Sequence, residues 1–215
     1  KLDKEELIRQ TEVMKEMGFG GFFMHSRTGL ATEYLSDEWF DDINACADAA
    51  EKEDMESWLY DEDRWPSGSA GGIATKEEKY RMQYLRCNIV MKDLFEWSDD
   101  IICAFAADVD GINFLGEVQI SKHTDIVSLP TKDIIYFTQE YMVPTPTYNE
   151  SSYLDTLSRE ATEHFIETTH ELYAKKCGKR IGKSIQGIFT DEPHRGALMT
   201  GFSVPNREPA MLAPY

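Results

Sequence analysis

Three short apolar segments that run directly into polar side chains organise this sequence. They cover residues 21–24, 57–60 and 187–190, and their length is typical of buried strands. The residues that follow them are His25-Ser26-Arg27, Asp61-Glu62-Asp63-Arg64-Trp65 and Asp191-Glu192-Pro193. The pattern therefore predicts three strands, each with reactive side chains at its carboxyl end.

A helical pattern precedes each of these strands. Asp3 with Glu6 resembles a capping pair, and Ser36 and Ser158 are suited to cap two further helices. Apolar residues recur at helical spacing behind the caps: Leu7, Met14 and Met17; Phe40, Ile43, Ala47 and Ala50; Ala161, Phe165, Leu172 and Tyr173. Alternating helices and strands predict a parallel sheet whose outer faces are covered by helices.

The middle of the chain has a different pattern. Residues 88–94, 101–109, 112–120 and 134–141 are strand-like, and Asp110-Gly111 is a strong signal for a hairpin turn. We expect three regions: the first βα units in 1–85, an antiparallel β insertion in 86–150, and a further α/β unit in 151–215. Within them, the glycine- and serine-rich residues 66–80 are interpreted as an active-site loop, and 194–215 as loop.

Composition narrows the classes of ligand. The formal net charge of -17 argues against binding nucleic acid or an anionic membrane, and leaves neutral sugars and cations open. The four cysteines show no C-x-x-C spacing, which disfavours a disulfide framework or a zinc site and favours free thiols in the cytoplasm. No apolar run approaches the roughly 20 residues of a membrane helix. We assign no cofactor and no metal.

Three phrases of the sequence resemble a known family. They are Gly20-Gly21-Phe22-Phe23-Met24-His25-Ser26-Arg27-Thr28-Gly29-Leu30, Leu59-Tyr60-Asp61-Glu62-Asp63-Arg64-Trp65-Pro66-Ser67-Gly68 and Ile188-Phe189-Thr190-Asp191-Glu192-Pro193. Together they are similar to large bacterial glycoside hydrolases of the α-L-rhamnosidase-like group. The resemblance implies an α/β fold, a (β/α)8 TIM-type barrel. Because a complete barrel takes about 250 residues, the chain is either a fragment of a barrel or a smaller open sheet. We favour the fragment and expect a partial barrel, its front half, interrupted by the antiparallel insertion.

The resemblance also implies site residues. In barrel glycosidases a Glu at the end of the fourth strand is the acid/base, often within Asn-Glu-Pro, so Glu192 of Asp191-Glu192-Pro193 takes that role here. Asp191 departs from the usual Asn and places a second negative charge nearby. The partner carboxylate is expected outside this chain. The expected substrate is an oligosaccharide or polysaccharide, and the expected substrate-binding residues are His25, Arg27, Asp61, Asp63, Trp65 and Asp191. His123, His164 and His170 are interpreted as structural or surface residues.

Two other functions stay open. One is a metal-dependent barrel enzyme, such as a sugar isomerase or hydrolase, with ligands drawn from His25, Asp61, Asp63, Glu192 and His194. The other is a sugar-binding protein without catalytic activity. Because a partial barrel exposes two unpaired parallel edges, we also expect a homo-oligomer or a completing segment of the same protein.

Overall fold

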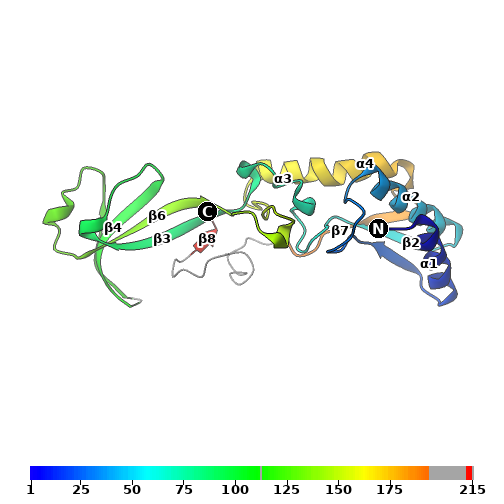
Figure 1. Ribbon diagram of the computed structural model, residues 1–215, viewed down its shortest axis with the longest axis horizontal. Coiled ribbons are helices and arrows are strands. Elements are labelled where there is room, and N and C mark those ends of the chain that lie inside the picture. Colours follow the sequence, from blue (N-terminus) through cyan, green and yellow to red (C-terminus); the bar gives the residue numbers. More distant parts are fainter. Residues whose placement is uncertain (112, 194–211, 215) are drawn as a thin grey trace. The chain divides into compact units, whose positions relative to one another are not determined.

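The computed structural model describes residues 1–111, 113–193 and 212–214. These residues form two compact units (Figure 1). The first contains Lys1–Arg81 together with the chain from Val143 to Pro193, and the second contains Met82–Met142 together with a short strand, β8. The polypeptide therefore leaves the first unit after Arg81 and returns to it at Val143.

The first unit is built on a parallel sheet of three strands. Strands β1 (Gly21–Met24), β2 (Glu56–Tyr60) and β7 (Ile185–Phe189) lie in the order β1-β2-β7. Gly21 allows the close pairing of the first two strands, because a Cβ atom there would lie 2.5 Å from the carbonyl oxygen of Glu56. All three predicted strands are confirmed.

The predicted helix starts are confirmed as well. Helices α1 (Lys4–Glu16), α2 (Asp37–Lys52) and α3 (Arg159–Phe165) begin after Asp3, Ser36 and Ser158. Each of these three side chains accepts a hydrogen bond from a backbone N–H of its helix's first turn. The third helical segment is interrupted by a π-helical turn, Ile166–His170, and continues as α4 (Glu171–Cys177).

One face of the parallel sheet is buried by helices. Met24, Leu59 and Ile185 pack in a single core with side chains of α2 and α4, and Figure 1 shows these helices beside the sheet. The opposite face remains open within the described residues, since Phe23 is 53% exposed and Phe189 is 42% exposed. Shorter 3₁₀ turns lie at Ala70–Gly72, Glu78–Tyr80, Lys92–Leu94, Ile126–Ser128, Pro146–Tyr148 and Gly178–Arg180.

The second unit is an antiparallel sheet with strand order β5-β4-β6-β3-β8. Its strands are β3 (Gln83–Met91), β4 (Ile101–Asp110), β5 (Asn113–Ile120), β6 (Asp133–Tyr141) and β8 (Leu212–Pro214). The four predicted antiparallel strands are therefore confirmed, although β3 starts earlier than predicted and 92–94 is a 3₁₀ turn. β4 and β5 form a hairpin as predicted, but Asp110 pairs with Asn113 and so belongs to the strand rather than to the turn predicted at Asp110-Gly111.

The expected partial (β/α)8 barrel is wrong. The described residues contain one parallel sheet of three strands and a separate antiparallel sheet, and the parallel sheet has β1 and β7 as edges. Alternation of helix and strand is a property of any parallel sheet covered by helices, so it predicted the local units correctly. It carries no information on how many strands join or whether they close into a ring. That part of the expectation came from the acids at the strand ends, which barrel enzymes share with open parallel sheets, and from the resemblance. Among the described residues, no helix is long and apolar enough to cross a membrane.

Candidate active site

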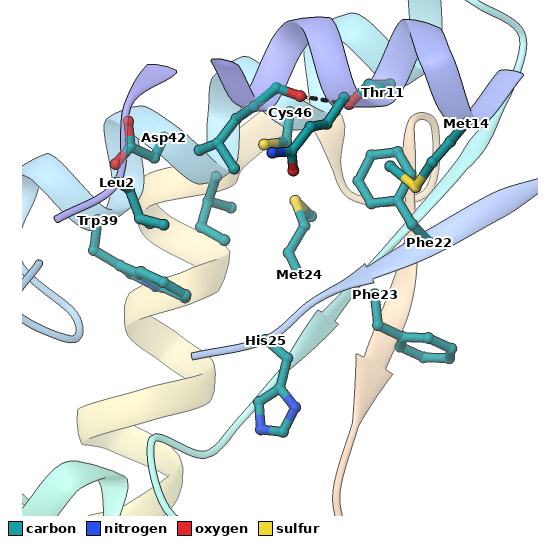
Figure 2. Close-up of a pocket in the computed structure, with 13 residues that line it drawn as sticks. Leu2, Thr11, Met14, Phe22, Phe23, Met24, His25, Trp39, Asp42 and Cys46 are labelled. Atoms are coloured by element: carbon teal, nitrogen blue, oxygen red, sulfur yellow. Dashed lines mark hydrogen bonds between the residues drawn. The ribbon is translucent and has the colours of Figure 1, made fainter. Parts of the chain in front are cut away.

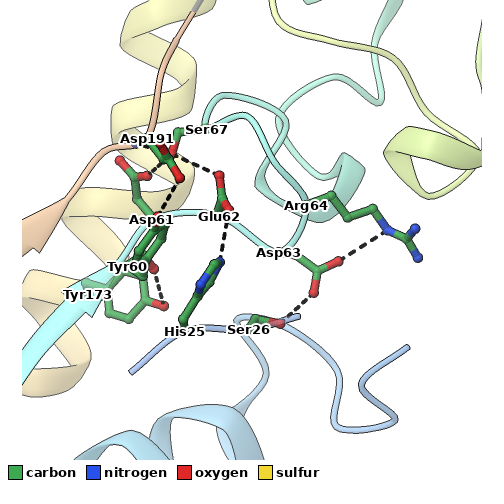
Figure 3. A network of polar contacts seen from close by, with 10 residues as sticks. All are labelled: His25, Ser26, Tyr60, Asp61, Glu62, Asp63, Arg64, Ser67, Tyr173 and Asp191. Atoms are coloured by element: carbon green, nitrogen blue, oxygen red, sulfur yellow. Dashed lines mark hydrogen bonds and ion pairs between the residues drawn. The ribbon is translucent and has the colours of Figure 1, made fainter. Parts of the chain in front are cut away.

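The carboxyl ends of the three parallel strands bring the predicted site residues together. Leu59 pairs with Met24 on one side and with Ile188 on the other, so the chain segments that follow β1, β2 and β7 start from one edge. Figure 3 shows His25, Asp61 and Asp191 gathered there with several residues that the sequence did not single out. We call this group the carboxyl edge.

Asp61 connects three segments of the first unit. It is fully buried, and its Oδ1 accepts a hydrogen bond of 2.5 Å from the hydroxyl of Ser67. Its Oδ2 accepts bonds of 2.7 Å from the Thr190 hydroxyl and from Nε2 of His170. Both oxygens are therefore engaged by the protein. The prediction that Asp61 binds substrate is not tested by this arrangement, which instead holds the strand ends together.

Glu62 contacts His25 inside the carboxyl edge. The Glu62 side chain is 2% exposed, and its Oε1 lies 2.9 Å from Nε2 of His25 (Figure 3). The Ser67 hydroxyl lies 3.5 Å from the other carboxylate oxygen. Glu62 was not predicted as a site residue, because in an extended strand its side chain would face away from Asp61 and Asp63. β2 ends at Tyr60, so the alternation of a paired strand does not hold for the residues that follow it.

Burial shifts both partners of this contact toward their neutral forms. It raises the pKa of Glu62 to about 7, and the negative charges of Asp191 and Asp61 add to the effect. Burial and the positive charge of Arg27 lower the pKa of His25. Both shifts act against charge on the two partners, so burial disfavours an ion pair at this contact.

Asp191 is held from two sides. Its Oδ2 accepts a 2.5 Å hydrogen bond from the hydroxyl of Tyr60, whose pKa is raised by burial and by this bond. Its backbone N–H donates to the Ser67 hydroxyl at 2.8 Å, and its carbonyl accepts from the Ser67 N–H at 2.9 Å. The Tyr60 ring stacks on the imidazole of His25, with ring centroids 3.7 Å apart. The position of the Asp191 carboxylate is therefore fixed.

Asp63 points away from this cluster toward Arg64. Its Oδ1 accepts a 2.6 Å hydrogen bond from the buried Ser26, and its Oδ2 lies 3.7 Å from Nε of Arg64 (Figure 3). Arg27 is exposed, and its charge acts on both His25 and Glu62. Asp63 and Arg27 thus border the carboxyl edge.

Glu192 and Trp65 are exposed side chains. The backbone of Glu192 has φ of +43°, in the left-handed region that non-glycine residues seldom adopt. Such strain concentrates at functional sites, where neighbouring structure holds it in place. Here the bonds between Asp191 and Ser67 supply that support. His194, a candidate ligand in the metal-dependent alternative, lies outside the described residues. Among the described residues, no group of three His, Cys, Asp or Glu side chains is arranged to hold a metal ion.

His170 reaches Asp61 because of the π-helical turn. A π turn adds one residue to the helical repeat, so positions after it rotate relative to a regular α-helix. The apolar periodicity of 3.6 residues gave His170 a structural or surface position and could not anticipate the turn. Ser67 was missed for another reason, since it lies in the glycine- and serine-rich segment whose conformation no periodic pattern describes.

An apolar cavity of about 220 Å³ lies beside His25. It is lined by residues of α1, α2 and β1, including Leu7, Phe22 and Met24 (Figure 2). The lining also contains the Asp42 carboxylate, and the lowered pKa of His25 comes from its burial and from Arg27, which together outweigh the opposing charges of Asp191 and Asp63.

Comparison of the chain with protein-family models, curated proteins and solved structures finds no match.

Proposed function

We propose that this protein hydrolyses glycosidic bonds at the carboxyl edge of the β1-β2-β7 sheet. The observation that carries the proposal is the group of acids at this edge: Glu62, whose pKa is raised to about 7 by burial and by the charges of Asp191 and Asp61, lies near Asp191, and the exposed Glu192 follows Asp191 directly in the chain. Glycosidic cleavage needs a carboxylic acid that is protonated near neutral pH and a second carboxylate. Carboxylic acids whose surroundings shift their pKa values away from the ordinary value are typical of catalytic sites.

The exposure of Glu192 and the burial of Glu62 decide the role that each carboxyl group has in the proposed reaction. Glu192 is exposed and able to touch a substrate, so it keeps the acid/base role that the resemblance implies. Glu62 is buried and does not reach a substrate, so we propose it as a positioning residue. Its charge, absent below a pH of about 7 and present above it, sets the electrostatic field around Asp191. Asp61 has a positioning role in the proposal, because its contacts with Ser67 and His170 connect these residues to the strand ends.

The proposed substrate is an oligosaccharide or polysaccharide. His25, Arg27, Asp63 and Asp191 offer hydrogen-bonding groups at or beside the carboxyl edge, and sugar hydroxyls both donate and accept. Trp65 is exposed and presents an aromatic ring on which a sugar ring stacks.

The test is release of reducing sugar from a panel of oligosaccharides and aryl glycosides. The natural polypeptide is used, because the resemblance implies a second carboxylate outside these 215 residues. Glu192→Gln should lower kcat by about 10²–10⁴-fold, the contribution of general acid–base catalysis. Glu167→Gln, at an exposed position on the π turn, is the control and should keep wild-type turnover.

The possible results of this test distinguish the acid/base assignment, the glycosidase and the metal-dependent enzyme. Full activity in Glu192→Gln would move the acid/base to another carboxylate. Absence of turnover by the wild type on the whole panel, with or without added divalent metal, would reject the glycosidase. Turnover that disappears on treatment with EDTA would instead favour the metal-dependent enzyme.

A cytoplasmic location is proposed on the cysteines alone. Cys46, Cys87, Cys103 and Cys177 are free thiols, and three of them are buried. Free thiols are typical of proteins in reducing compartments.

A further inference from the structure

A second hollow borders the carboxyl edge on the side of Arg64. It has a volume of about 240 Å³ and is formed by the loop after β1, the segment after β2 and Asn149. Its polar lining includes Glu33, Asp63, Arg64 and Asn149. We call it the Arg64 pocket. All of its residues belong to the first unit.

The guanidinium of Arg64 has unused donors in this pocket. Its Nε is buried without a hydrogen-bond partner, at 3.7 Å from Oδ2 of Asp63. Its two terminal nitrogens make bonds of 3.3 Å to the Pro146 carbonyl and to Oδ1 of Asn149. A guanidinium carries five N–H donors, so each terminal nitrogen keeps one N–H beyond these bonds for a ligand, whereas the buried Nε is closed to it. The arrangement therefore favours a ligand that supplies acceptors.

The charges of the lining select a neutral ligand. Arg64 offers donors, while the carboxylates of Asp63 and Glu33 offer acceptors on the same wall. An anion would face two carboxylates, and a cation would face the guanidinium. A hydroxyl donates and accepts at once, so a compound with several hydroxyls satisfies both kinds of group.

The size of the pocket limits the ligand to one ring. Its 240 Å³ lies below the roughly 300–1,000 Å³ of pockets for drug-sized molecules. Gly71 keeps this room open, because a Cβ atom there would lie 3.3 Å from Cβ of Asp63 and 3.4 Å from the ring of Tyr34. Its φ of +65° also disfavours a side chain.

We propose that the Arg64 pocket binds one neutral sugar unit of the substrate. Asp63 links the pocket to the carboxyl edge, because one of its oxygens accepts from Ser26 while the other faces Arg64. The pocket is then a subsite for a sugar unit next to the one at which the bond is cleaved. This role rests on the proposed glycosidase function, whereas binding of the sugar itself does not require turnover.

Binding is measured first, by calorimetry on the natural polypeptide with neutral oligosaccharides and with a uronate-containing oligosaccharide of equal length. Arg64→Met should weaken binding of the neutral ligand about tenfold or more, the loss of one or two charge-assisted hydrogen bonds. Asn149→Gly, which removes a lining amide and suits the left-handed backbone at φ of +61°, should weaken it by a smaller factor. Arg159→Met, at an exposed ion pair on α3, is the control and should bind as the wild type does.

Kinetics then separate this proposal from the function on which it rests. Arg64→Met should raise KM about tenfold for oligosaccharides and by a clearly smaller factor for aryl monoglycosides, which lack the second sugar. Equal changes for both substrates, or wild-type affinity in Arg64→Met with an unchanged thermal midpoint, would overturn the subsite. Tighter binding of the uronate would overturn the neutral ligand. Loss of binding in Arg64→Met by a protein without turnover would retain the sugar site and reject the glycosidase.

Discussion

Glu62 shows how a single buried residue gives this protein a sensitivity to pH. Its neighbours were easier to predict, because Asp61, Asp63 and Asp191 stand at strand ends in the sequence. Glu62 is distinguished from them only by what buries it, namely contacts with segments that come from other parts of the chain. A sequence pattern can thus place a row of acids at a site, but the fold decides which acid is kept protonated.

The raised pKa of Glu62 should make stability fall with rising pH. In the unfolded chain this carboxyl ionises near its ordinary value of 4.5, whereas in the folded state it holds its proton to about 7. The folded state binds more protons between these values, so the stabilisation is fully present below 4.5 and is lost as pH rises through 7. The loss amounts to about 3 kcal/mol at most, because solvent screening reduces it.

Urea unfolding of the wild type and of Glu62→Gln at several values between pH 5 and 8 measures this effect. The free energy of unfolding of Glu62→Gln should vary less with pH than that of the wild type. Glu167→Gln controls for the general effect of removing one negative charge from an acidic chain. Identical pH profiles for the wild type and Glu62→Gln would show that Glu62 ionises normally.

At the scale of elements, the starts of α1, α2 and α3 and the three parallel strands followed from the sequence, whereas the bounds of β3, the strand β8 in a stretch predicted as loop, and the interior of the third helix did not. Caps and short apolar segments are local signals, and Ser36 and Ser158 are used as predicted. The π turn Ile166–His170 ends at the residue that contacts the buried Asp61, a partner 109 positions away in the chain. The apolar periodicity of a sequence does not predict an extra residue in one helical turn.

Removal of the donor at His170 should destabilise the first unit. His170→Leu leaves one bond fewer on a fully buried carboxylate and should cost about 1–3 kcal/mol of unfolding free energy. His170→Gln retains an N–H donor and should recover a substantial part of that loss. Chemical denaturation of both variants gives the comparison, and equal stability of the two would mean that the bond to Asp61 contributes little.

At the scale of the whole molecule, the pairing of β1, β2 and β7 followed from the sequence but its extent did not. The phrases behind the family resemblance span strand ends, and strand ends look alike in a three-stranded sheet and in a closed ring. The structure shows a sheet with two edges and an open aromatic face that includes Phe23 and Phe189. We therefore retain association, with a second copy or with a completing segment of the same protein, as a prediction.

The open face should make the 215-residue chain associate at high concentration. Edge strands with unpaired backbone groups and exposed aromatic rings favour contacts between copies. Light scattering in about 0.5 M salt, which screens the repulsion between copies of net charge -17, measures the effect. Phe23→Lys should lower the apparent mass, whereas Phe19→Lys, equally exposed but outside the sheet, should not. A wild-type monomer at high concentration would contradict the prediction.

The discontinuity of the first unit has a consequence for protein synthesis. Tyr60 and Asp191 are 131 positions apart in the chain, and the whole second unit up to Met142 is made between them. While the ribosome elongates the chain through that stretch, Glu62 lacks the negative charge of Asp191, which is one of the causes of its raised pKa. A chain that stalls before Asp191 therefore carries Glu62 with Asp61 and Ser67 but neither Asp191 nor Glu192, so its candidate site is incomplete.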